Sequence, residues 1–316
     1  MTTALETRRL DPEAEGIAMA ADLLRRGMLV SFPTETVYGL GGDAGNDLAV
    51  AGIYEAKGRP RFNPLIAHLP DLAAVERIAV LGDEARLLAE AFWPGPLTLV
   101  LPMRDGVGLS HLVSAGLPTV AVRVPAHPVA QALLRAVDRP IVAPSANPSG
   151  RISPTTADHV LAGLSGRIAA VLDGGPCGVG VESTIVGFGP RPTLLRPGGL
   201  STEDIETALG APLATRDEGA GITAPGQLAS HYAPDAPVRL DAKAARPGER
   251  LLGFGDVTAD WNLSPSGNLV EAAANLFRMM HEMDRAGDAP IAVSPIPDTG
   301  LGRAINDRLR RAAAPR

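Results

Sequence analysis

Cysteine, lysine and aromatic residues are scarce in this chain of 316 residues. The single cysteine, Cys177, rules out an internal disulfide and a cysteine-based zinc site, and it fits a reducing compartment. Because a lone cysteine is usually a small buried apolar group, we do not expect Cys177 to be a nucleophile. Aromatic residues make up only 3% of the sequence, so leucine, valine, isoleucine and alanine must supply the core.

Long apolar runs and an excess of positive charge are also missing. No stretch approaches membrane-spanning length, and positions 1–6 lack the basic region and apolar run of a secretory signal. We therefore expect a cytoplasmic protein with no membrane partner. The formal net charge is −6, whereas proteins that hold duplex nucleic acid usually carry a basic excess. The cations are local, which suits a small anionic ligand better.

A cationic turn stands out at 57–64. Lysine occurs only as Lys57 and Lys243, and Lys57 lies two and four residues before Arg59 and Arg61. Arginine clamps oxyanions in a bidentate way, and lysine acts as a mobile point charge on phosphate. Three cations in five residues repel one another unless an anion lies among them. We predict a triphosphate site here, with a solvated basic loop as the alternative.

Polar residues beside predicted strands provide further candidates. The segment 33–43 reads as a binding loop with threonine hydroxyls and several glycines, which let a ligand approach the backbone closely. Ser145 and Asn147 follow an apolar strand, and strand ends are where α/β sheets present ligand-binding groups. Arg123 alternates with valines in a strand at 118–125 and requires an anionic partner, unless it is a surface charge on an edge strand.

Two further positions have equally plain alternatives. His68 lies in a strand at 65–69, where a histidine among apolar neighbours is more often structural than functional. Ser153 and Thr155 stand at the start of a predicted helix, where hydroxyls and free N–H groups suit an anion. Helix capping explains these two residues nearly as well.

The length and the pattern predict two domains joined by a linker. We place the first domain at 1–210, the linker at 211–236 and a small α/β domain at 237–316. In the first domain we predict a helix opened by Asp11-Pro12 and closed by Gly27, strands at 28–32, 65–69, 97–101, 118–125, 169–172 and 193–196, and helices at 48–56 (capped by Asn46), 82–93, 127–137 and 201–209. In the last domain we predict strands at 238–240, 250–254 and 290–293 and helices at 269–286 and 303–314. The linker lacks periodicity yet contains His231-Tyr232, which is unusual for a passive tether.

Seven motifs occur in a fixed order along the chain. They are Pro33-Thr-Glu-Thr-Val-Tyr-Gly-Leu, Lys57-Gly-Arg, Asn63-Pro-Leu, Trp93-Pro-Gly-Pro-Leu-Thr, Arg123-Val-Pro, Ser145-Ala-Asn147 and Glu182-Ser-Thr184. Together they resemble the YrdC-type threonylcarbamoyl-AMP synthase family over about residues 10–208. The linker with its His-Tyr pair and the C-terminal α/β module resemble the two-domain branch of that family.

The resemblance implies a fold and a reaction. The fold is an open, twisted YrdC-like α/β sheet with a concave cationic cavity, plus a small Rossmann-like C-terminal α/β domain. The reaction converts L-threonine, bicarbonate and ATP, which carries Mg²⁺, into threonylcarbamoyl-AMP and pyrophosphate. It serves threonylcarbamoyladenosine formation in tRNA. The implied partner is the downstream tRNA threonylcarbamoyl-transferase machinery, and we expect tRNA binding by this chain to be weak or absent.

The resemblance also implies the site residues. The catalytic set would be Lys57, Arg59, Ser145 and Asn147, acting by position and charge rather than as covalent nucleophiles. ATP would be bound by Lys57, Arg59, Asn63, Thr119, Ser145, Ser153, Arg196, His231 and Tyr232. Threonine would be bound by Thr36, His68, Arg123, Ser183 and main-chain contacts near Ala143, with Arg123 pairing with its carboxylate. As metal ligands we cannot rank the four carboxylates Glu35, Asp43, Asp173 and Glu182.

The linker departs from the family pattern. Many two-domain relatives have a basic motif resembling Pro-Gly-Met-Lys-x-Arg-His-Tyr, whereas here Pro225-Gly226 is followed by Gln227-Leu-Ala-Ser and then His231-Tyr232. Both linker cations are absent, so we carry over only His231 and Tyr232. The segment is predicted to act as a lid that shields labile intermediates from water.

Three other interpretations are open. A non-enzymatic RNA-binding module is disfavoured by the acidic pI and by the scarcity of aromatic residues for stacking bases. A carbamoyl-transfer domain of the hydrogenase-maturation kind would bring cysteine-rich zinc modules, which one cysteine cannot form. An inactive nucleotide-binding α/β protein is disfavoured because Lys57 and all the polar motif positions are present.

Overall fold

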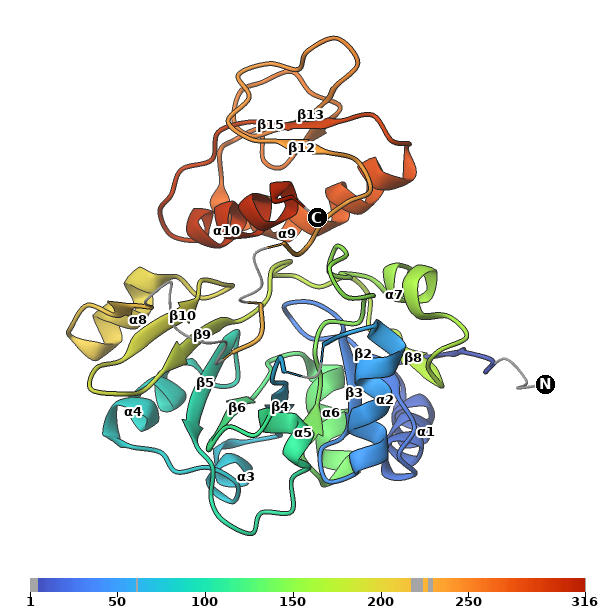
Figure 1. Cartoon of the computed structure of the whole chain (residues 1–316), viewed down its shortest axis with the longest axis vertical. Helices are drawn as coiled ribbons and strands as arrows, with labels where there is room; N and C mark the ends of the chain where they lie inside the picture. The colour runs from blue at the N-terminus through green and yellow to red at the C-terminus, as the bar shows by residue number, and fades with distance from the viewer. Residues whose placement is uncertain (1–4, 61, 217–223, 227–229, 316) are drawn as a thin grey trace.

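The computed structural model describes residues 5–60, 62–216, 224–226 and 230–315, which are built around two sheets (Figure 1). The strands of the larger sheet are β1 (Arg8–Leu10), β2 (Val30–Phe32), β3 (Gly39–Asp43), β4 (Ile66–His68), β5 (Leu97–Pro102), β6 (Thr119–Arg123), β7 (Ile141–Val142), β8 (Ala170–Leu172), β9 (Thr184–Gly187), β10 (Thr193–Arg196) and β11 (Ala214–Thr215). The smaller sheet consists of β12 (Val238–Arg239), β13 (Arg250–Gly253), β14 (Trp261–Asn262) and β15 (Ile291–Val293). We call the two parts the large-sheet domain and the small-sheet domain.

The larger sheet is 11-stranded and mixed, with the order β1-β8-β2-β3-β7-β4-β6-β5-β9-β10-β11. Its middle strands hold several predicted site residues close together. His68 lies opposite Arg123 in the parallel pair β4–β6, and β5 pairs with β6 on its other side. Ser145 forms a bridge with Gly39, which brings the end of β7 next to β3. Arg123 is therefore in the interior of the sheet.

Helices cover both faces of the larger sheet. They are α1 (Ala14–Arg25), α2 (Asp47–Lys57), α3 (Leu72–Glu76), α4 (Asp83–Phe92), α5 (His111–Ser114), α6 (Pro128–Val137), α7 (Ala157–Leu164) and α8 (Thr202–Leu209). Buried residues of α1 and α6 share one apolar cluster with Ala170 and Leu172 of β8, whereas Val171 belongs to a second cluster with α2, α4 and α7. Alternate residues of a strand face opposite sides, so the two clusters lie on opposite faces of the sheet.

The small-sheet domain has the parallel strand order β12-β15-β13-β14 and two long helices, α9 (Leu269–Arg285) and α10 (Gly302–Ala313). Both helices lie between the small sheet and the large-sheet domain (Figure 1). An apolar cluster joins Val37 and Val181 of the large-sheet domain to Phe277 and Ile305 of these helices. Gly180 has φ +78°, and a Cβ there would come within 2.4 Å of the Ala273 carbonyl oxygen, so the two domains pack backbone to backbone.

The structure confirms most predicted elements and corrects others. Asn46 caps α2 as predicted, since its side chain accepts from the N–H groups of Leu48 and Ala49. The segment 33–43 is not a loop throughout, because Gly39–Asp43 forms the buried strand β3 in spite of its glycines.

The first helix does not open at Asp11-Pro12. It begins at Ala14, with Glu13 in the N-cap position. Besides β3, four strands were not predicted: β1, which begins with two arginines, β9, and the two-residue strands β11 and β14. No helix in the described ranges is long and apolar enough to cross a membrane.

Candidate active site

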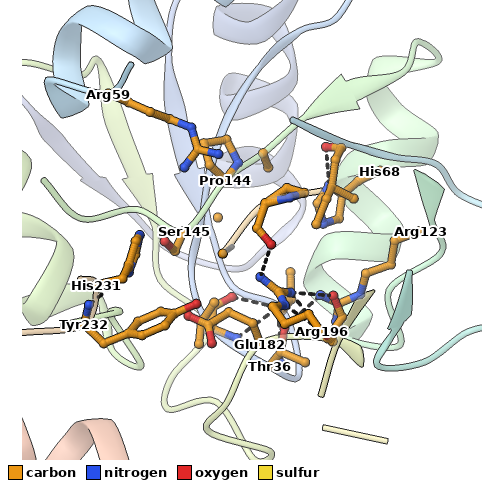
Figure 2. Close-up of a pocket in the computed structure, with 18 residues that line it drawn as sticks. Thr36, Arg59, His68, Arg123, Pro144, Ser145, Glu182, Arg196, His231 and Tyr232 are labelled. Atoms are coloured by element: carbon orange, nitrogen blue, oxygen red, sulfur yellow. Dashed lines mark hydrogen bonds between the residues drawn. The ribbon is translucent and has the colours of Figure 1, made fainter. Parts of the chain in front are cut away.

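One cavity with charged and polar side chains in its lining lies against the middle strands of the larger sheet (Figure 2). Ile66 and His68 both line it, so it runs along one face of β4 rather than beyond the strand ends. Ten of the predicted site residues line the cavity: Thr36, Arg59, His68, Arg123, Ala143, Ser145, Ser183, Arg196, His231 and Tyr232. Residues far apart in the sequence thus converge on one space.

The remaining predicted residues do not line the cavity. Lys57, Asn63, Asn147 and Ser153 are buried. Thr119 is half-buried and lies at the other end of β6 from Arg123, paired with Pro102. The structure therefore separates Thr119 from the cavity, and its predicted contact with ATP stays a prediction.

Lys57 links the cationic turn to the Ser-x-Asn motif. It is the last residue of α2, and its Nζ donates to the carbonyl oxygens of Ser145, at 2.6 Å, and Asn147. Burial, reinforced by the nearby Arg59, lowers the pKa of Lys57 well below its ordinary value. Burial therefore disfavours the charged form of Lys57, and a bound anion would stabilise it.

Several buried polar atoms around the cationic turn have no hydrogen-bond partner. They are Nε of Arg59, Nδ2 and Oδ1 of Asn63, and Oδ1 of Asn147. Burial lowers the pKa of Arg59 to about 10, which still leaves the guanidinium charged near neutral pH. Buried polar groups are almost always satisfied in folded proteins, so this group of atoms is suited to a polar ligand. Arg61 lies outside the described residues.

Arg123 has an acceptor for each of its nitrogens. Nη2 donates to Oε1 of Glu35 at 2.6 Å, Nη1 to Oγ1 of Thr36 at 2.9 Å, and Nε to the Gly95 carbonyl oxygen at 3.2 Å. The side chain is 4% exposed, so the alternative of a surface charge on an edge strand is wrong. The sequence pattern missed Glu35 as the partner that orients Arg123.

His68 is both satisfied and in contact with the cavity. Its Nδ1 lies 3.2 Å from the Ile66 carbonyl oxygen, to which it can only donate. Burial, and then the charge of Arg123, lower the pKa of His68 to about 3, so the ring is neutral at physiological pH. The structural and functional interpretations of His68 are therefore compatible.

Arg196 and Ser183 both line the cavity. Nε and Nη2 of Arg196 donate to the Ser183 carbonyl oxygen at 3.2 and 2.8 Å. The Ser183 hydroxyl lies 2.7 Å from that of Thr98, in the motif that begins at Trp93. Two of the seven sequence motifs thus meet at one hydroxyl pair.

Glu182 is the only carboxylate among the described residues that line the cavity. Its Oε1 accepts from the Ser153 hydroxyl at 2.5 Å, and its Oε2 accepts from Nε of Arg308 at 2.7 Å. Burial alone would raise the pKa of Glu182, but Arg308, Arg196 and the Ser153 hydroxyl outweigh it and lower the pKa to about 2. Sequence reasoning missed Arg308, because nothing in the last helix signals a partner so far back in the chain.

The other three carboxylates considered as metal ligands lie elsewhere. Glu35 pairs with Arg123, Asp43 with Arg139, and Asp173 accepts from Arg9 and Tyr38. Within the described part of the chain, no group of three or more histidine, cysteine or carboxylate side chains could hold a metal ion. The Cys177 thiol is buried, which raises its pKa, as expected for a structural residue.

The His-Tyr pair is buried between the domains. The Tyr232 ring centroid lies 5.6 Å from that of Phe277 on α9 and 5.1 Å from Cζ of Arg308 on α10. His231 accepts at Nδ1 from the Tyr232 N–H at 2.9 Å. In Figure 2 the Tyr232 ring points toward Glu182. Residues 217–223 and 227–229 of the predicted lid lie outside the described residues.

The helix after Ser153 and Thr155 corrects another expectation. Thr156 caps α7 by accepting from the His159 N–H, so neither Ser153 nor Thr155 is the N-cap. Ser153 instead donates its hydroxyl proton to Glu182. The capping alternative for Ser153 is therefore wrong.

Known proteins are similar to this chain over almost its whole length. The family model for Sua5, YciO and YrdC, described as telomere recombination, matches residues 22–198, and the model for the C-terminal domain of threonylcarbamoyl-AMP synthase matches residues 200–314. A threonylcarbamoyl-AMP synthase of Pyrococcus abyssi is 42% identical over 94% of each chain. One of Bacillus subtilis is 43% identical over 97% of this chain and 94% of its own. The crystal structure of Pyrococcus abyssi Sua5 complexed with L-threonine superposes with a TM-score of 0.88, at 40% identity and 98% coverage of both chains.

These likenesses define the class of protein first and then the family. The larger sheet with its cavity is a domain of the Sua5–YciO–YrdC class. Because the C-terminal model follows in order, the chain belongs to the threonylcarbamoyl-AMP synthase family in its two-domain form. The predicted family and the predicted YrdC-like α/β fold with a C-terminal domain are confirmed.

Proposed function

We propose that the chain is a threonylcarbamoyl-AMP synthase, a nucleotidyltransferase that converts L-threonine, bicarbonate and ATP into threonylcarbamoyl-AMP, pyrophosphate and water. Relatives that are more than 40% identical over almost the whole chain carry that name. The observation that carries the proposal is the convergence of the motif residues on one cavity. Ser145 and Arg123 both line it, and Lys57 is hydrogen-bonded to the backbone of Ser145.

The triphosphate would lie near the cationic turn. Arg59 lines the cavity and keeps Nε without a partner, and Asn63 and Asn147 have further free polar atoms beside it. Phosphate oxygens would satisfy the Arg59 N–H and the Asn63 amide N–H groups, and Lys57 would add its charge. The nucleotide site would be completed by Ser145, Ser153, Arg196, His231 and Tyr232. Thr119 lies apart from the cavity on β6, so ATP would have to extend toward it to make the predicted contact.

Threonine would lie near Arg123. Its carboxylate would pair with the guanidinium that Glu35 and Thr36 already orient. The neutral ring of His68 borders the same region, with the Ser183 hydroxyl and the backbone at Ala143. A cavity that binds an amino acid at one end and a triphosphate at the other would hold the two reactants in line.

The chemistry requires position and charge rather than a protein nucleophile. The threonine nitrogen attacks bicarbonate and water leaves; a carbamate oxygen then attacks the α-phosphorus of ATP and pyrophosphate leaves. Negative charge grows on the phosphoryl oxygens and the leaving group, where fixed cations stabilise it. Mg²⁺ would be held by phosphate oxygens and water, because both oxygens of Glu182 are already engaged.

The proposal extends to organisation and setting. We assign catalysis to 1–210, the lid to 211–236 and the C-terminal domain to 237–316. The two separate sheets support two domains, whereas β11, near the start of the assigned lid, still pairs with β10 of the larger sheet. We propose that the enzyme acts in the cytoplasm, supported by its single cysteine, and passes its product to the tRNA threonylcarbamoyl-transferase machinery. The net charge of −6 supports weak or absent tRNA binding by this chain.

Pyrophosphate release tests the proposal. We expect release only when threonine, bicarbonate and ATP are all present, and serine in place of threonine should react roughly 10–200-fold less efficiently because only a methyl group distinguishes them. Arg59→Met should raise the KM for ATP at least about tenfold and change the KM for threonine less than about threefold, because a charge-assisted contact to phosphate is lost. Arg104→Met, at an exposed arginine, is the control. Release without threonine, or an unchanged KM for ATP in Arg59→Met, would contradict the assignment.

A further inference from the structure

The small-sheet domain places one charged side chain against Glu182, a residue that lines the cavity. Arg308 projects from α10 and is 0% exposed. Its Nε donates to Glu182 at 2.7 Å, and its Nη1 donates to the Pro197 carbonyl oxygen at 3.0 Å and to Oδ2 of Asp307 at 2.6 Å. Its Cζ lies over the Tyr232 ring. One guanidinium therefore contacts the catalytic domain, its own helix and the His-Tyr segment.

Glu182, the partner of Arg308, carries a negative charge that opposes anion binding in this cavity. Glu182 faces the space that would hold a triphosphate, and a buried carboxylate repels phosphate strongly because little water screens the two charges. Arg196, a cation of the catalytic domain itself, is directed at the Ser183 carbonyl oxygen. Among the described residues, Arg308 is the one that neutralises Glu182 directly by forming an ion pair with it.

The same pair orders two other members of the nucleotide site. Oε1 of Glu182 accepts from the hydroxyl of Ser153, while Oε2 is held by Arg308. Arg308 also fixes the Tyr232 ring between itself and Phe277. Fixing the carboxylate thus fixes the buried Ser153 hydroxyl, and Arg308 itself holds Tyr232, which lines the cavity.

We propose that Arg308 is a positioning residue for the ATP site: it neutralises Glu182 and holds Ser153 and Tyr232, so that the site is complete only while the small-sheet domain is docked. The inference rests on the proposed function, because it needs the triphosphate in this cavity. It gives the C-terminal domain a direct part in nucleotide binding, without contact between that domain and ATP.

The test uses the full-length chain and measures kcat and the two KM values by pyrophosphate release. Arg308→Met should raise the KM for ATP at least about tenfold, because an unpaired carboxylate then faces the phosphates, while the KM for threonine stays within about threefold. Arg308→Lys, which keeps the charge, should recover most of the loss. Adding Glu182→Gln to Arg308→Met should bring the KM for ATP back toward the wild-type value, because it removes the charge left unpaired. Arg310→Met, at an exposed arginine of the same helix, is the matched control.

A purely structural role would give a different pattern. If Arg308→Met is folded but leaves the KM for ATP unchanged, or if the double variant is as impaired as the single one, the proposal is wrong. If Arg308→Met does not fold, Arg308→Lys and the double variant are compared with the wild type: KM values for ATP near the wild-type value support the proposal, and values at least about tenfold higher contradict it. An effect of Arg59→Met without any effect of Arg308→Met would overturn this inference alone, whereas no effect of Arg59→Met would overturn the ATP site itself.

Discussion

Arg123 is held by three neighbours before any substrate arrives. Glu35 and Thr36 come from the segment that follows β2, and Gly95 comes from the turn before β5. A guanidinium can bond all three because its donors form a planar fork, whereas an ammonium on a flexible stem cannot reach them together. The side chain is therefore pre-set for a carboxylate rather than free to search for one.

This orientation leads to a prediction for threonine binding. Arg123→Lys keeps the charge but loses the fork, so the KM for threonine should rise at least about tenfold while the KM for ATP changes less than about threefold. Pyrophosphate release at varied threonine and ATP checks it, and Arg86→Lys, at an exposed arginine of α4, is the control. Equal effects on both KM values would show that Arg123 supports the fold of the cavity and not threonine specifically.

At this scale, sequence motifs identified the residues that carry charge but not their partners. The scarcity of lysine predicted the importance of Lys57, and the alternation of valines predicted that Arg123 needs an anion. The sequence did not reveal Glu35 and Arg308 as ion-pair partners, because an ion pair between distant positions leaves no local pattern. Tyr38, which stood in a predicted binding loop, is bonded instead to Asp173 and Gly175.

Among the elements, the segment at 224–226 requires a glycine at one position. Gly226 has φ +81°, and a Cβ there would come within 2.9 Å of Cδ and Nη1 of Arg196 and 3.0 Å of the Tyr232 hydroxyl. Gly226 therefore lets the chain close over Arg196. Gly248 has a similar φ of +84°, but a Cβ there would meet nothing within 4 Å.

These two glycines form a matched pair for a test. Gly226→Ala should lower kcat/KM for ATP at least about tenfold, because both backbone strain and a clash with Arg196 displace the segment. Gly248→Ala imposes comparable backbone strain far from the cavity and should leave kcat/KM nearly unchanged. If the two variants behave alike, the close approach of Gly226 to Arg196 does not matter for activity.

Elements were predictable where they are long or have a strong pattern. The helices α4, α9 and α10 have clear periodicity, and the cap at Asn46 indicated the start of α2. The strand β3 was missed because Gly39, Gly41 and Gly42 suggest a loop, yet they fit there under Phe32 and Ile53. Two-residue strands such as β14 are too short for alternation to show.

Across the whole molecule, the contact between the two domains could not be read from the sequence. Two histidines meet there: His159 on α7 and His281 on α9 stack with ring centroids 3.9 Å apart. Nε2 of His281 donates to the Ser153 carbonyl oxygen at 3.2 Å. Nδ1 of His159 accepts from the Thr155 N–H at 3.3 Å. Each pattern that predicted a helix was local, whereas this stack depends on how two separate cores pack.

The stack makes the stability of the protein depend on pH. Burial is the main reason that the pKa of His159 falls to about 3 and that of His281 to about 4. The charges of His281, Arg285 and Arg278 lower the pKa of His159 further. The charge of Arg285 also lowers the pKa of His281, where the hydrogen bond to Ser153 opposes the shift. In the unfolded chain the rings titrate near pH 6.5, so between about pH 6.5 and 4 the unfolded state binds more protons and the folded state loses stability as pH falls.

Replacing one ring should weaken this dependence. In His281→Gln one titrating group is gone and the amide can still donate to the Ser153 carbonyl oxygen, so the thermal midpoint should fall less between pH 7 and pH 5 than in the wild type. Differential scanning calorimetry at both pH values measures the difference. His111→Gln, at an exposed histidine of α5, should retain the wild-type dependence. If all three proteins lose the same number of degrees on acidification, the acid sensitivity originates outside the domain interface, because a buried neutral pair cannot be removed without changing the proton balance of unfolding.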